Sequence, residues 1–271
     1  MQTRLSQNIG GRRLLLAGIL LLGVIAFVQL GISPSDTLPS ASRSSSFIQF
    51  VKAAFTPALD ADARRNTAEA VFTTLQFAAI ATTISVIAGL VLGFLGSTAW
   101  WPKGSRSNPL RIALFCITRA VITLMRSIHE LLWALLFLVA IGFTHTAGVI
   151  AVAIPFSGTF AKIFSEMIDE APREAADALG AAGASPLRVY LFGLLPQAIP
   201  DILAYTLYRF ECALRASAVM GFFGVATFGY FLKLAFEDLN FPLVWTYLYA
   251  LIFLVIIFDL WSATARRRIA H

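Results

Sequence analysis

The chain has 271 residues, of which 58% are hydrophobic and 13% charged, and its mean hydropathy is +0.77. Soluble domains carry about 25% charged residues, so this composition excludes a soluble globular domain and indicates an integral membrane protein. The apolar runs are long enough for helices and lack the alternation of an outer-membrane barrel. The net charge of +6 is therefore assigned to loops on the inner side of the membrane rather than to nucleic-acid binding.

The first 66 residues carry one apolar run and a polar linker. Arginines within residues 4–13 precede an uncharged stretch, residues 14–32, which is just long enough to span a bilayer. A cleaved signal peptide has the same order of features, but this run is long and no small-residue cleavage site follows it, so a retained helix is favoured. A Ser/Pro-rich linker occupies residues 33–46, and residues 47–65 form a modestly amphipathic segment at the outer interface.

The middle of the chain predicts three crossings. Residues 68–99 form the first of them, with Gly89, Gly93 and Gly96 permitting close helix packing, and Trp100-Trp101 ends it at interface depth. A basic loop follows. Residues 112–142 are apolar but punctuated by charges, which indicates a helix on the inner membrane side that becomes a crossing at 128–142. Another crossing spans 147–168.

After a polar hairpin come a crossing at 198–223, a glycine-broken segment at 221–229 and a last crossing at 241–263. The basic loop with Lys103, Arg106 and Arg111 and the basic tail 266–271 then fall on the N-terminal side. The connections 143–146 and 237–240 contain no Lys or Arg and fall on the opposite side, as the positive-inside rule requires. The sequence therefore predicts an all-α polytopic membrane protein with six crossings and both termini in the cytosol.

The polar hairpin, residues 169–200, is the longest charge-bearing interruption of the apolar second half. Pro172 fits the first turn of a short helix, with Asp169 and Glu170 near its positive end. Gly183 is expected to end that helix because glycine adopts positive φ freely. Ser185 and Pro186 then start a second helix. Pro196 and Pro200 are expected to end or bend it.

Four positions of this hairpin resemble the loop signature of ABC importer membrane subunits, which reads Glu-Ala-Ala, three residues, Gly, and later Leu-Pro. Asp177-Ala178-Leu179, Gly183 and Leu195-Pro196 match it, with Asp in place of Glu. The alternative register, Glu174-Ala175-Ala176 with Gly180, leaves Leu-Pro three residues too far away. Without the resemblance, the segment is an ordinary Ala-rich helical hairpin. The resemblance implies a coupling loop at about 169–196, gripped by a separate ATPase. Its candidate residues are Glu174, Asp177, Ala178, Leu179, Gly183, Ala184, Ser185, Pro186, Leu195 and Pro196.

Two further stretches, residues 126–134 (RSIHELLWA) and 210–221 (FECALRASAVMG), are similar to segments of phosphonate-type permeases. The chain departs from that pattern at His129, where Pro is usual, and at Ala226-Thr227, where a Gly-Gly pair is common. The resemblance covers roughly residues 67–265, which implies the transmembrane core of a type I importer with residues 1–66 added in front. It implies a phosphonate- or phosphite-type oxyanion as cargo, with another small solute, such as an amino acid, as the alternative.

An anion crossing hydrocarbon needs a water-filled path with a weak positive bias. The functional hypothesis is that charged residues, two serines and the glycine-broken segment line this path or its gate. The alternative is structural ion pairing, because Arg126–Glu130 and Glu211–Arg215 are both spaced i,i+4, and packing roles for His129 and the serines. The glycines form either an outer lid or an ordinary turn. The candidates are Arg126, Ser127, His129, Glu130, Arg209, Glu211, Arg215, Ser217, Gly221, Gly224 and Gly229.

No G-x-x-x-x-G-K-[ST] loop occurs, so the chain is not predicted to be an enzyme, and no cofactor or metal is expected on it. ATP and Mg belong to the partner. The resemblance implies two copies of a cytosolic ATPase, an extracytoplasmic binding protein, a second copy of this chain and membrane lipid as partners, at the cytoplasmic membrane. A secondary transporter or channel would show inverted repeats. An intramembrane enzyme would need a constellation that Cys116, Cys212 and the three histidines do not form.

Overall fold

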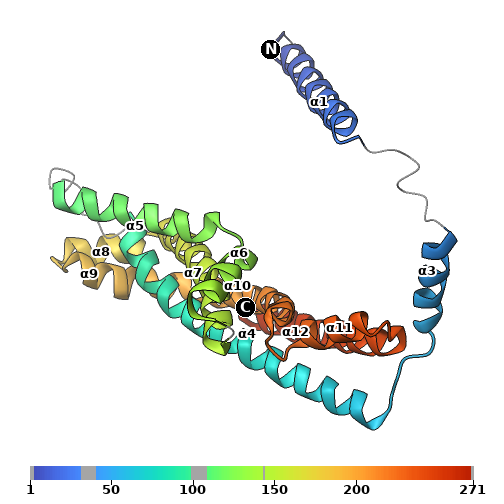
Figure 1. Cartoon of the computed structure of the whole chain (residues 1–271). Coiled ribbons are helices and arrows are strands. Elements are labelled where there is room, and N and C mark those ends of the chain that lie inside the picture. The colour runs from blue at the N-terminus through green and yellow to red at the C-terminus, as the bar shows by residue number, and fades with distance from the viewer. Residues whose placement is uncertain (1–2, 32–40, 99–108, 143, 270–271) are drawn as a thin grey trace. The chain divides into compact units, whose positions relative to one another are not determined.

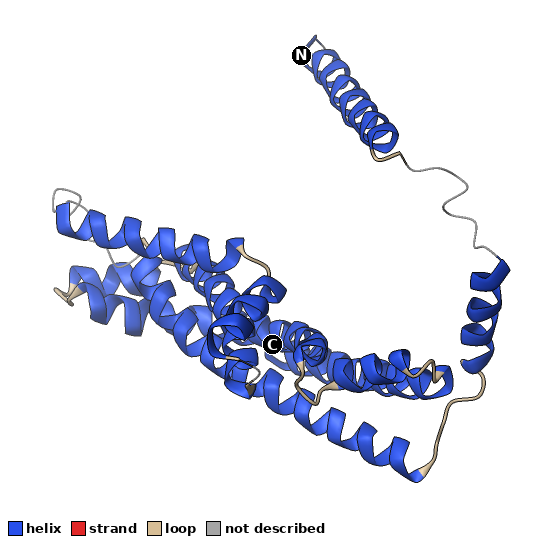
Figure 2. Cartoon of the chain, in the orientation of Figure 1, coloured by secondary structure: helices blue, strands red, loops and turns tan. Residues whose placement is uncertain are grey.

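The computed structural model describes residues 3–31, 41–98, 109–142 and 144–269, and within these ranges it contains helices and connecting turns but no strand (Figure 1, Figure 2). The chain divides into two compact units, Met1–Lys52 and Ala53–His271. The first unit contains α1 (Thr3–Gln29) and nearly all of α3 (Ala41–Ala53). Much of the predicted linker, the tryptophan pair at 100–101 and the basic residues at 103 and 106 lie outside the described residues.

The second unit is a bundle of helices that carries all the candidate site residues. Its elements are α4 (Ala61–Gly96), α5 (Pro109–Ser127), α6 (Glu130–Ile141), α7 (His145–Glu170), α8 (Glu174–Ala181), α9 (Pro186–Val189), the π-helical turn η2 (Tyr190–Leu194), α10 (Leu195–Val219), the 3₁₀ turn η3 (Met220–Phe223), α11 (Phe228–Glu237) and α12 (Phe241–Ile269).

Four helices of the described residues are long and apolar enough to cross a membrane, namely α4, α7, α12 and the continuous rod Pro186–Phe223. The segments Ile112–Ser127 and Glu130–Ile141 meet this test only as a pair, bent by 92°. The twelve residues of α6 span about 18 Å, less than the ~30 Å hydrocarbon core, so α6 alone is too short to cross. Leu14–Gln29 is a shorter apolar helix. Six crossings therefore remain a prediction.

The rod Pro186–Phe223 corrects one expectation about the hairpin. Pro196 and Pro200 are expected to end or bend the second hairpin helix. The helix ends at neither proline and continues into the predicted fifth crossing, while a bend at either proline stays a prediction. Pro196 stands in the first turn of α10, directly after the π-helical turn, where a missing backbone N–H is tolerated. The hairpin and the membrane helix are therefore one continuous element.

Glycines allow α4 and α7 to pack in close contact, as the small residues predicted. A Cβ on Gly89 would lie 2.5 Å from the Cβ of Phe160, and one on Gly93 would lie 3.2 Å from the Ala161 carbonyl oxygen. Ser85 adds a hydrogen bond across the same interface, donating from Oγ to the Ala153 carbonyl at 3.1 Å. Such contacts bring the two backbones within van der Waals distance, which is how helices associate in lipid.

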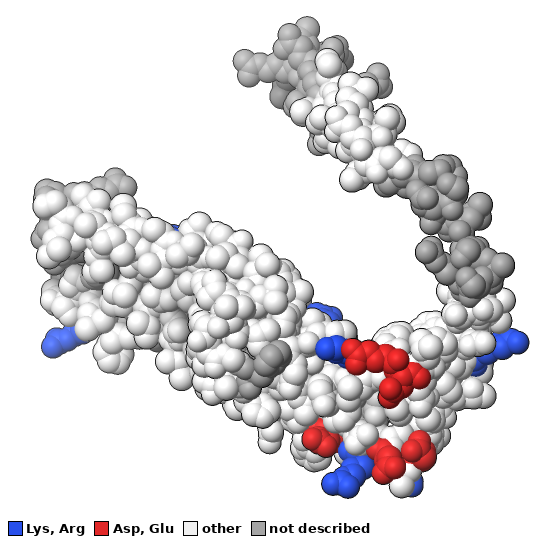
Figure 3. All heavy atoms as spheres, viewed as in Figure 1, with Lys and Arg blue, Asp and Glu red and all other residues white. Residues whose placement is uncertain are grey.

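Aromatic rings fill the space between α7 and α10. The ring of Tyr205 on α10 packs edge-on against Phe160 and Phe164, with centroids 5.7 Å and 6.4 Å apart, and both phenylalanines are fully buried. On the outside the bundle is apolar: α12 exposes Ile252, Phe253 and similar side chains. Figure 3 shows charged side chains gathered near one end of the bundle and few along the middle of the visible face. This distribution suits a lipid-embedded protein.

Candidate functional site

The predicted elbow of the hairpin is confirmed at Gly183. Its φ is +81°, and the N–H of Gly183 donates to the Gly180 carbonyl while the N–H of Ala184 donates to the Leu179 carbonyl, both at 3.0 Å. This pair of bonds is the Schellman motif, which ends a helix on a left-handed glycine. Ser185 occupies the N-cap position and Pro186 the first turn of α9, as predicted, although the Ser185 hydroxyl makes no capping bond.

Most of the predicted coupling residues lie on the surface of the hairpin. Space around Gly183 is open, since a Cβ built there would meet no atom within 4 Å. The residues from Glu174 to Pro186 are exposed except at three half-buried or buried positions, Ala176, Leu179 and Ala184. Leu195 is half-buried and Pro196 exposed. The hairpin therefore presents a polar, accessible face that another protein could contact.

The other face of the hairpin is fixed to the bundle. Ala176 is buried, and a Cβ on Gly193 would lie 3.0 Å from its Cα, so α8 rests directly on the π-helical turn. Tyr190 begins that turn, is 3% exposed, and packs edge-on against Phe94 of α4 with centroids 4.7 Å apart. π-helical turns are rare and are often found at functional sites.

Asp169 does not occupy the place that the sequence predicted. It lies in the last turn of α7 rather than the first turn of the next helix, and Arg173 is the N-cap of α8. Its carboxylate instead accepts hydrogen bonds from the hydroxyls of Ser97 (2.5 Å) and Thr98 (3.0 Å) and from the Thr98 N–H (3.0 Å). An acidic residue at a helix C-terminus is unfavourable by about 0.3–1 kcal/mol, and these charge-assisted bonds offset that cost.

The charged stretch at 126–130 marks the sharp bend between α5 and α6. Ser127 ends α5, with its hydroxyl donating to the Thr123 carbonyl at 2.6 Å, and His129 caps α6 by accepting from the Leu131 N–H at 3.3 Å. The suggested Arg126–Glu130 pair within one helix is wrong, because the helix breaks between these residues. Glu130 lies instead 3.5 Å from His129.

The suggested Glu211–Arg215 pair is confirmed, at 3.3 Å, and Arg215 also approaches the Cys212 sulfur at 3.6 Å. Glu211 is buried while Arg215 is exposed. A pocket of about 280 Å³ between α6 and α10 is lined by Arg215 and Cys212 on one side and by His129 and Glu130 on the other. The structure thus brings the two predicted charged stretches together, although they lie some 85 residues apart in the chain.

Arg209 lies deeper, over an aromatic ring. Its guanidinium carbon is 4.2 Å from the centroid of Phe156 on α7, and its buried Nε has no hydrogen-bond partner among the described residues. Arg126, by contrast, is exposed at the end of α5. Neither arginine has a carboxylate within ion-pair distance in the part of the chain that the structure describes. Ser217 is fully buried, and its hydroxyl has no partner there.

The glycine-broken segment is a tightly packed turn. Gly224 adopts a left-handed φ of +88°, between η3 and α11, and the Thr227 hydroxyl donates to the Ala218 carbonyl at 3.1 Å. A Cβ on Gly221 would lie 2.1 Å from the Tyr230 nitrogen, and one on Gly229 would lie 2.4 Å from the Ala218 carbonyl oxygen. These two glycines therefore let η3 and α11 approach within backbone contact.

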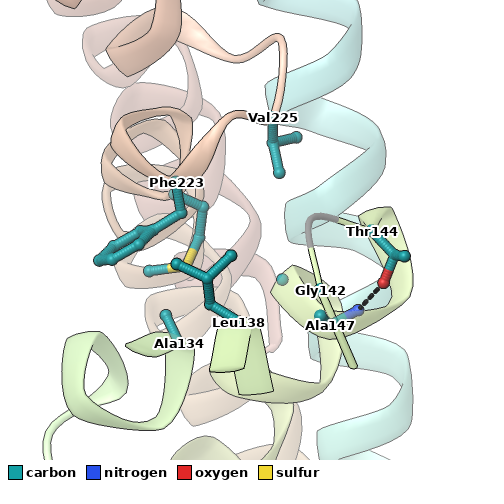
Figure 4. Close-up of a pocket in the computed structure, with 9 residues that line it drawn as sticks. Ala134, Leu138, Gly142, Thr144, Ala147, Phe223 and Val225 are labelled. Atoms are coloured by element: carbon teal, nitrogen blue, oxygen red, sulfur yellow. Dashed lines mark hydrogen bonds between the residues drawn. The ribbon is translucent and has the colours of Figure 1, made fainter. Parts of the chain in front are cut away.

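This turn closes over the ends of α6 and α7. Phe223 and Val225 face Leu138 and Ala134 of α6 across a small, mostly apolar pocket, beside the Thr144 hydroxyl that caps α7 by accepting from the Ala147 N–H at 3.1 Å (Figure 4). The volume left between them, about 20 Å³, holds roughly one water molecule. The segment thus packs closely against α6 and α7, and its role as a lid stays a prediction. No group of three potential metal ligands occurs among the described residues.

Comparison with known proteins identifies relatives across most of the bundle. The family model "Binding-protein-dependent transport system inner membrane component" matches residues 109–271. The chain is 32% identical over 197 residues to the phosphite transport system permease protein PtxC of Stutzerimonas stutzeri, covering 72% of this chain and 68% of that protein. It is 32% identical over 169 residues to the phosphate-import permease protein PhnE of Mycolicibacterium smegmatis, covering 62% of this chain and 30% of that protein.

Solved structures show the same fold at lower identity. An inward-facing structure of the MetNI methionine ABC transporter superposes with a TM-score of 0.66 at 19% identity, covering 78% of this chain and 99% of that chain. An amino acid ABC transporter superposes with a TM-score of 0.62 at 21% identity, covering 76% and 94%. At identities this low the comparison shows the fold alone. The predicted fold, that of a type I importer membrane subunit, is confirmed.

Proposed function

The chain belongs to the family of binding-protein-dependent transport system inner membrane components, and from this premise we propose that it is the permease subunit of an ATP-driven importer for a phosphonate- or phosphite-type oxyanion. The names of its relatives support the cargo class. Within the molecule, the proposal rests mainly on the positive charges of Arg126 and Arg209, which have no carboxylate partner among the described residues.

The charges of the bundle do not balance locally. Glu166 is paired with Lys162, Glu211 with Arg215, and Glu130 lies beside His129. Arg126 and Arg209, like Arg119 on α5, have no carboxylate within ion-pair distance among the described residues, and an ionised group in a membrane segment marks a functional path by default. A divalent or monovalent oxyanion would supply the missing counter-charge as it passes.

The exposure of Arg126 and Arg215 supports a paired assembly. In a single copy both side chains are exposed, and a charged group facing hydrocarbon is costly, so this surface is expected to face a water-filled path rather than lipid. We propose that two copies of the chain enclose that path about a two-fold axis. Both termini then lie in the cytosol.

The exposed face of the hairpin supports docking to an ATPase. A cytosolic ATPase would grip α8 and Gly183 of each copy, with ATP and Mg held on the ATPase itself, and closure of the two motors would move the hairpins together. The tight turn at Gly221–Gly229 lies at the opposite end of the path, where a loaded binding protein would release its anion. The bundle would then switch between two conformations, and both the ATPase and the binding protein would shift the equilibrium between them.

The test is reconstitution of the chain with its ATPase and binding protein in liposomes, followed by uptake of phosphite or a simple phosphonate. ATP-dependent uptake is expected. Arg209→Gln is expected to lower it about tenfold or more, equivalent to ~1.4 kcal/mol of lost anion stabilisation. Arg209→Lys should retain part of the uptake, because it keeps the charge.

The matched control is Lys233→Gln, which removes a positive charge that is paired with Glu237 on α11, at 3.9 Å. Normal uptake is expected for this variant. Uptake of an uncharged solute with the same dependence on ATP, or full oxyanion uptake by Arg209→Gln, would contradict the proposed cargo and path.

A further inference from the structure

The last turn of α4 is held by both sides of the hairpin. On one side the carboxylate of Asp169, in the last turn of α7, accepts three hydrogen bonds from Ser97 and Thr98, which follow α4. On the other side Tyr190, after α8 and α9, packs against Phe94. Phe94 and Ser97 are one turn apart, so two attachments from opposite flanks of the hairpin converge on a single turn of one helix.

Asp169 is connected to α8 by a short segment that is itself restrained. Arg173, the N-cap of α8, donates from its guanidinium to the Asp169 carbonyl at 3.2 Å. The side chain of Asp169 therefore contacts α4 while its backbone contacts the start of α8. These contacts form a continuous connection from the start of α8 through Asp169 to the end of α4.

The helix α4 is suited to carry such a displacement across the membrane. Its 36 residues make a rod of about 54 Å, and Gly89 and Gly93 hold it in contact with α7. At its other end the segment before α4 is fixed to α12, where the Thr246 hydroxyl donates to the Ala58 carbonyl at 2.7 Å and the Ala58 N–H donates to the Pro242 carbonyl at 3.3 Å.

We propose that Asp169 is a positioning residue that links the coupling hairpin to α4, so that α4 receives the movement of the ATPase and carries it to the outer end of the bundle. This inference rests on the proposed function, since it presumes that an ATPase moves the hairpin. To the proposed function it adds that Asp169 and α4 transmit the movement from the hairpin to the membrane-spanning helices. The Asp169 carboxylate suits this place between two helix C-termini because its two oxygens together accept from both hydroxyls and from the backbone N–H.

The test uses the complete complex in liposomes and measures uptake per ATP hydrolysed. Asp169→Ala is expected to leave the amount of inserted chain and the binding of the ATPase unchanged, and to lower uptake per ATP about fivefold or more. Asp169→Asn should have a smaller effect, because its amide oxygen still accepts a hydrogen bond. Ser97→Ala should be milder again, since the Thr98 donors remain.

The double variant Asp169→Ala with Ser97→Ala is expected to have the same uptake per ATP as Asp169→Ala alone, because both substitutions break the same connection between Asp169 and α4. The control is Glu170→Gln, which removes a negative charge from the same helix end without touching Ser97 or Thr98, and its uptake per ATP should equal that of the wild type.

Four results separate the alternatives. If Asp169→Ala lowers ATP hydrolysis and uptake in the same proportion as the amount of assembled complex, Asp169 is structural only and the inference is wrong. Additive effects of the two substitutions would also overturn it. A wild-type complex that shows no ATP-dependent uptake rejects the proposed function itself, whereas a transporting wild type with normal coupling in Asp169→Ala rejects only the link through α4.

Discussion

Two glycine turns of the bundle need glycine for different reasons. Gly183, at the hairpin, has a φ of +81° and open space around it. Gly221 and Gly229, where η3 meets α11, have no positive φ, but a Cβ on either would lie closer than 2.5 Å to a backbone atom. The first glycine is required by backbone conformation and the others by close packing.

The difference leads us to expect that the Gly183 turn, rather than the Gly221–Gly229 turn, meets the ATPase. A turn with empty space around its glycine leaves room for another protein, whereas a turn filled by its own backbone is a sealed internal contact. We therefore expect substitution of Gly183 to act on assembly with the ATPase and substitution of Gly221 to act on folding. Three substitutions test this contrast.

The largest effect is expected for Gly221→Ala. The added methyl group would lie 2.1 Å from the Tyr230 nitrogen, so η3 and α11 must separate, at a cost of about 3 kcal/mol or more. Thermal unfolding of the purified protein in detergent should show a clear loss of stability. Gly18→Ala, which meets no atom within 4 Å, is the control; an unchanged melting temperature for Gly221→Ala would refute the packing role.

An intermediate effect is expected for Gly183→Leu. The left-handed backbone costs a residue with a side chain about 1–2 kcal/mol, which the chain should tolerate at an exposed turn. Uptake and binding of the ATPase should nevertheless be lost, because the side chain fills the open surface. Gly183→Asn separates backbone strain from obstruction of the surface, because asparagine tolerates positive φ but still adds a side chain. Normal uptake and ATPase binding by Gly183→Leu would show that the hairpin is not the docking surface.

The smallest effect is expected for Gly180→Ala. Gly180 lies within α8 at a negative φ with nothing within 4 Å, so alanine should strengthen the helix by about 0.5–1 kcal/mol. Uptake should stay normal or rise slightly. This variant also tests the register of the loop signature: loss of uptake in Gly180→Ala, together with tolerance at Gly183, would favour the alternative register that begins at Glu174.

The elbow at Gly183 was predictable because its cause is local. Glycine after an Ala-rich helical stretch and Ser-Pro before the next one specify a helix end and a helix start without any tertiary contact. The Glu211–Arg215 pair was predictable for the same reason, as both residues lie on one turn of one helix. Local chemistry also gave the order of the membrane helices, since apolar run length is set by the bilayer.

The features that the sequence did not predict depend on contacts between distant segments. The charges at 126–130 indicated a change of direction near residue 128, but the 92° angle between α5 and α6 and the early end of α6 depend on packing against other helices. Asp169 was assigned to the wrong helix, because its partners Ser97 and Thr98 lie 71 or 72 residues away. His129 and Arg215 likewise line one pocket because of how the helices pack, which no local sequence pattern specifies.

The rod from Pro186 to Phe223 places the hairpin and Arg209 on one helix, and this fixes their angular relation. Each residue of an α-helix rotates the next by about 100° and advances it 1.5 Å, so inserting or deleting one residue between Pro186 and Arg209 would swing the arginine to another side of the bundle. The π-helical turn at Tyr190–Leu194 holds one residue more than an α turn, and it therefore helps to set the angular position of Arg209 relative to the hairpin. We expect the spacing between hairpin and arginine to be intolerant of length change, whereas the Ser/Pro-rich segment near the N-terminus should accept insertions freely.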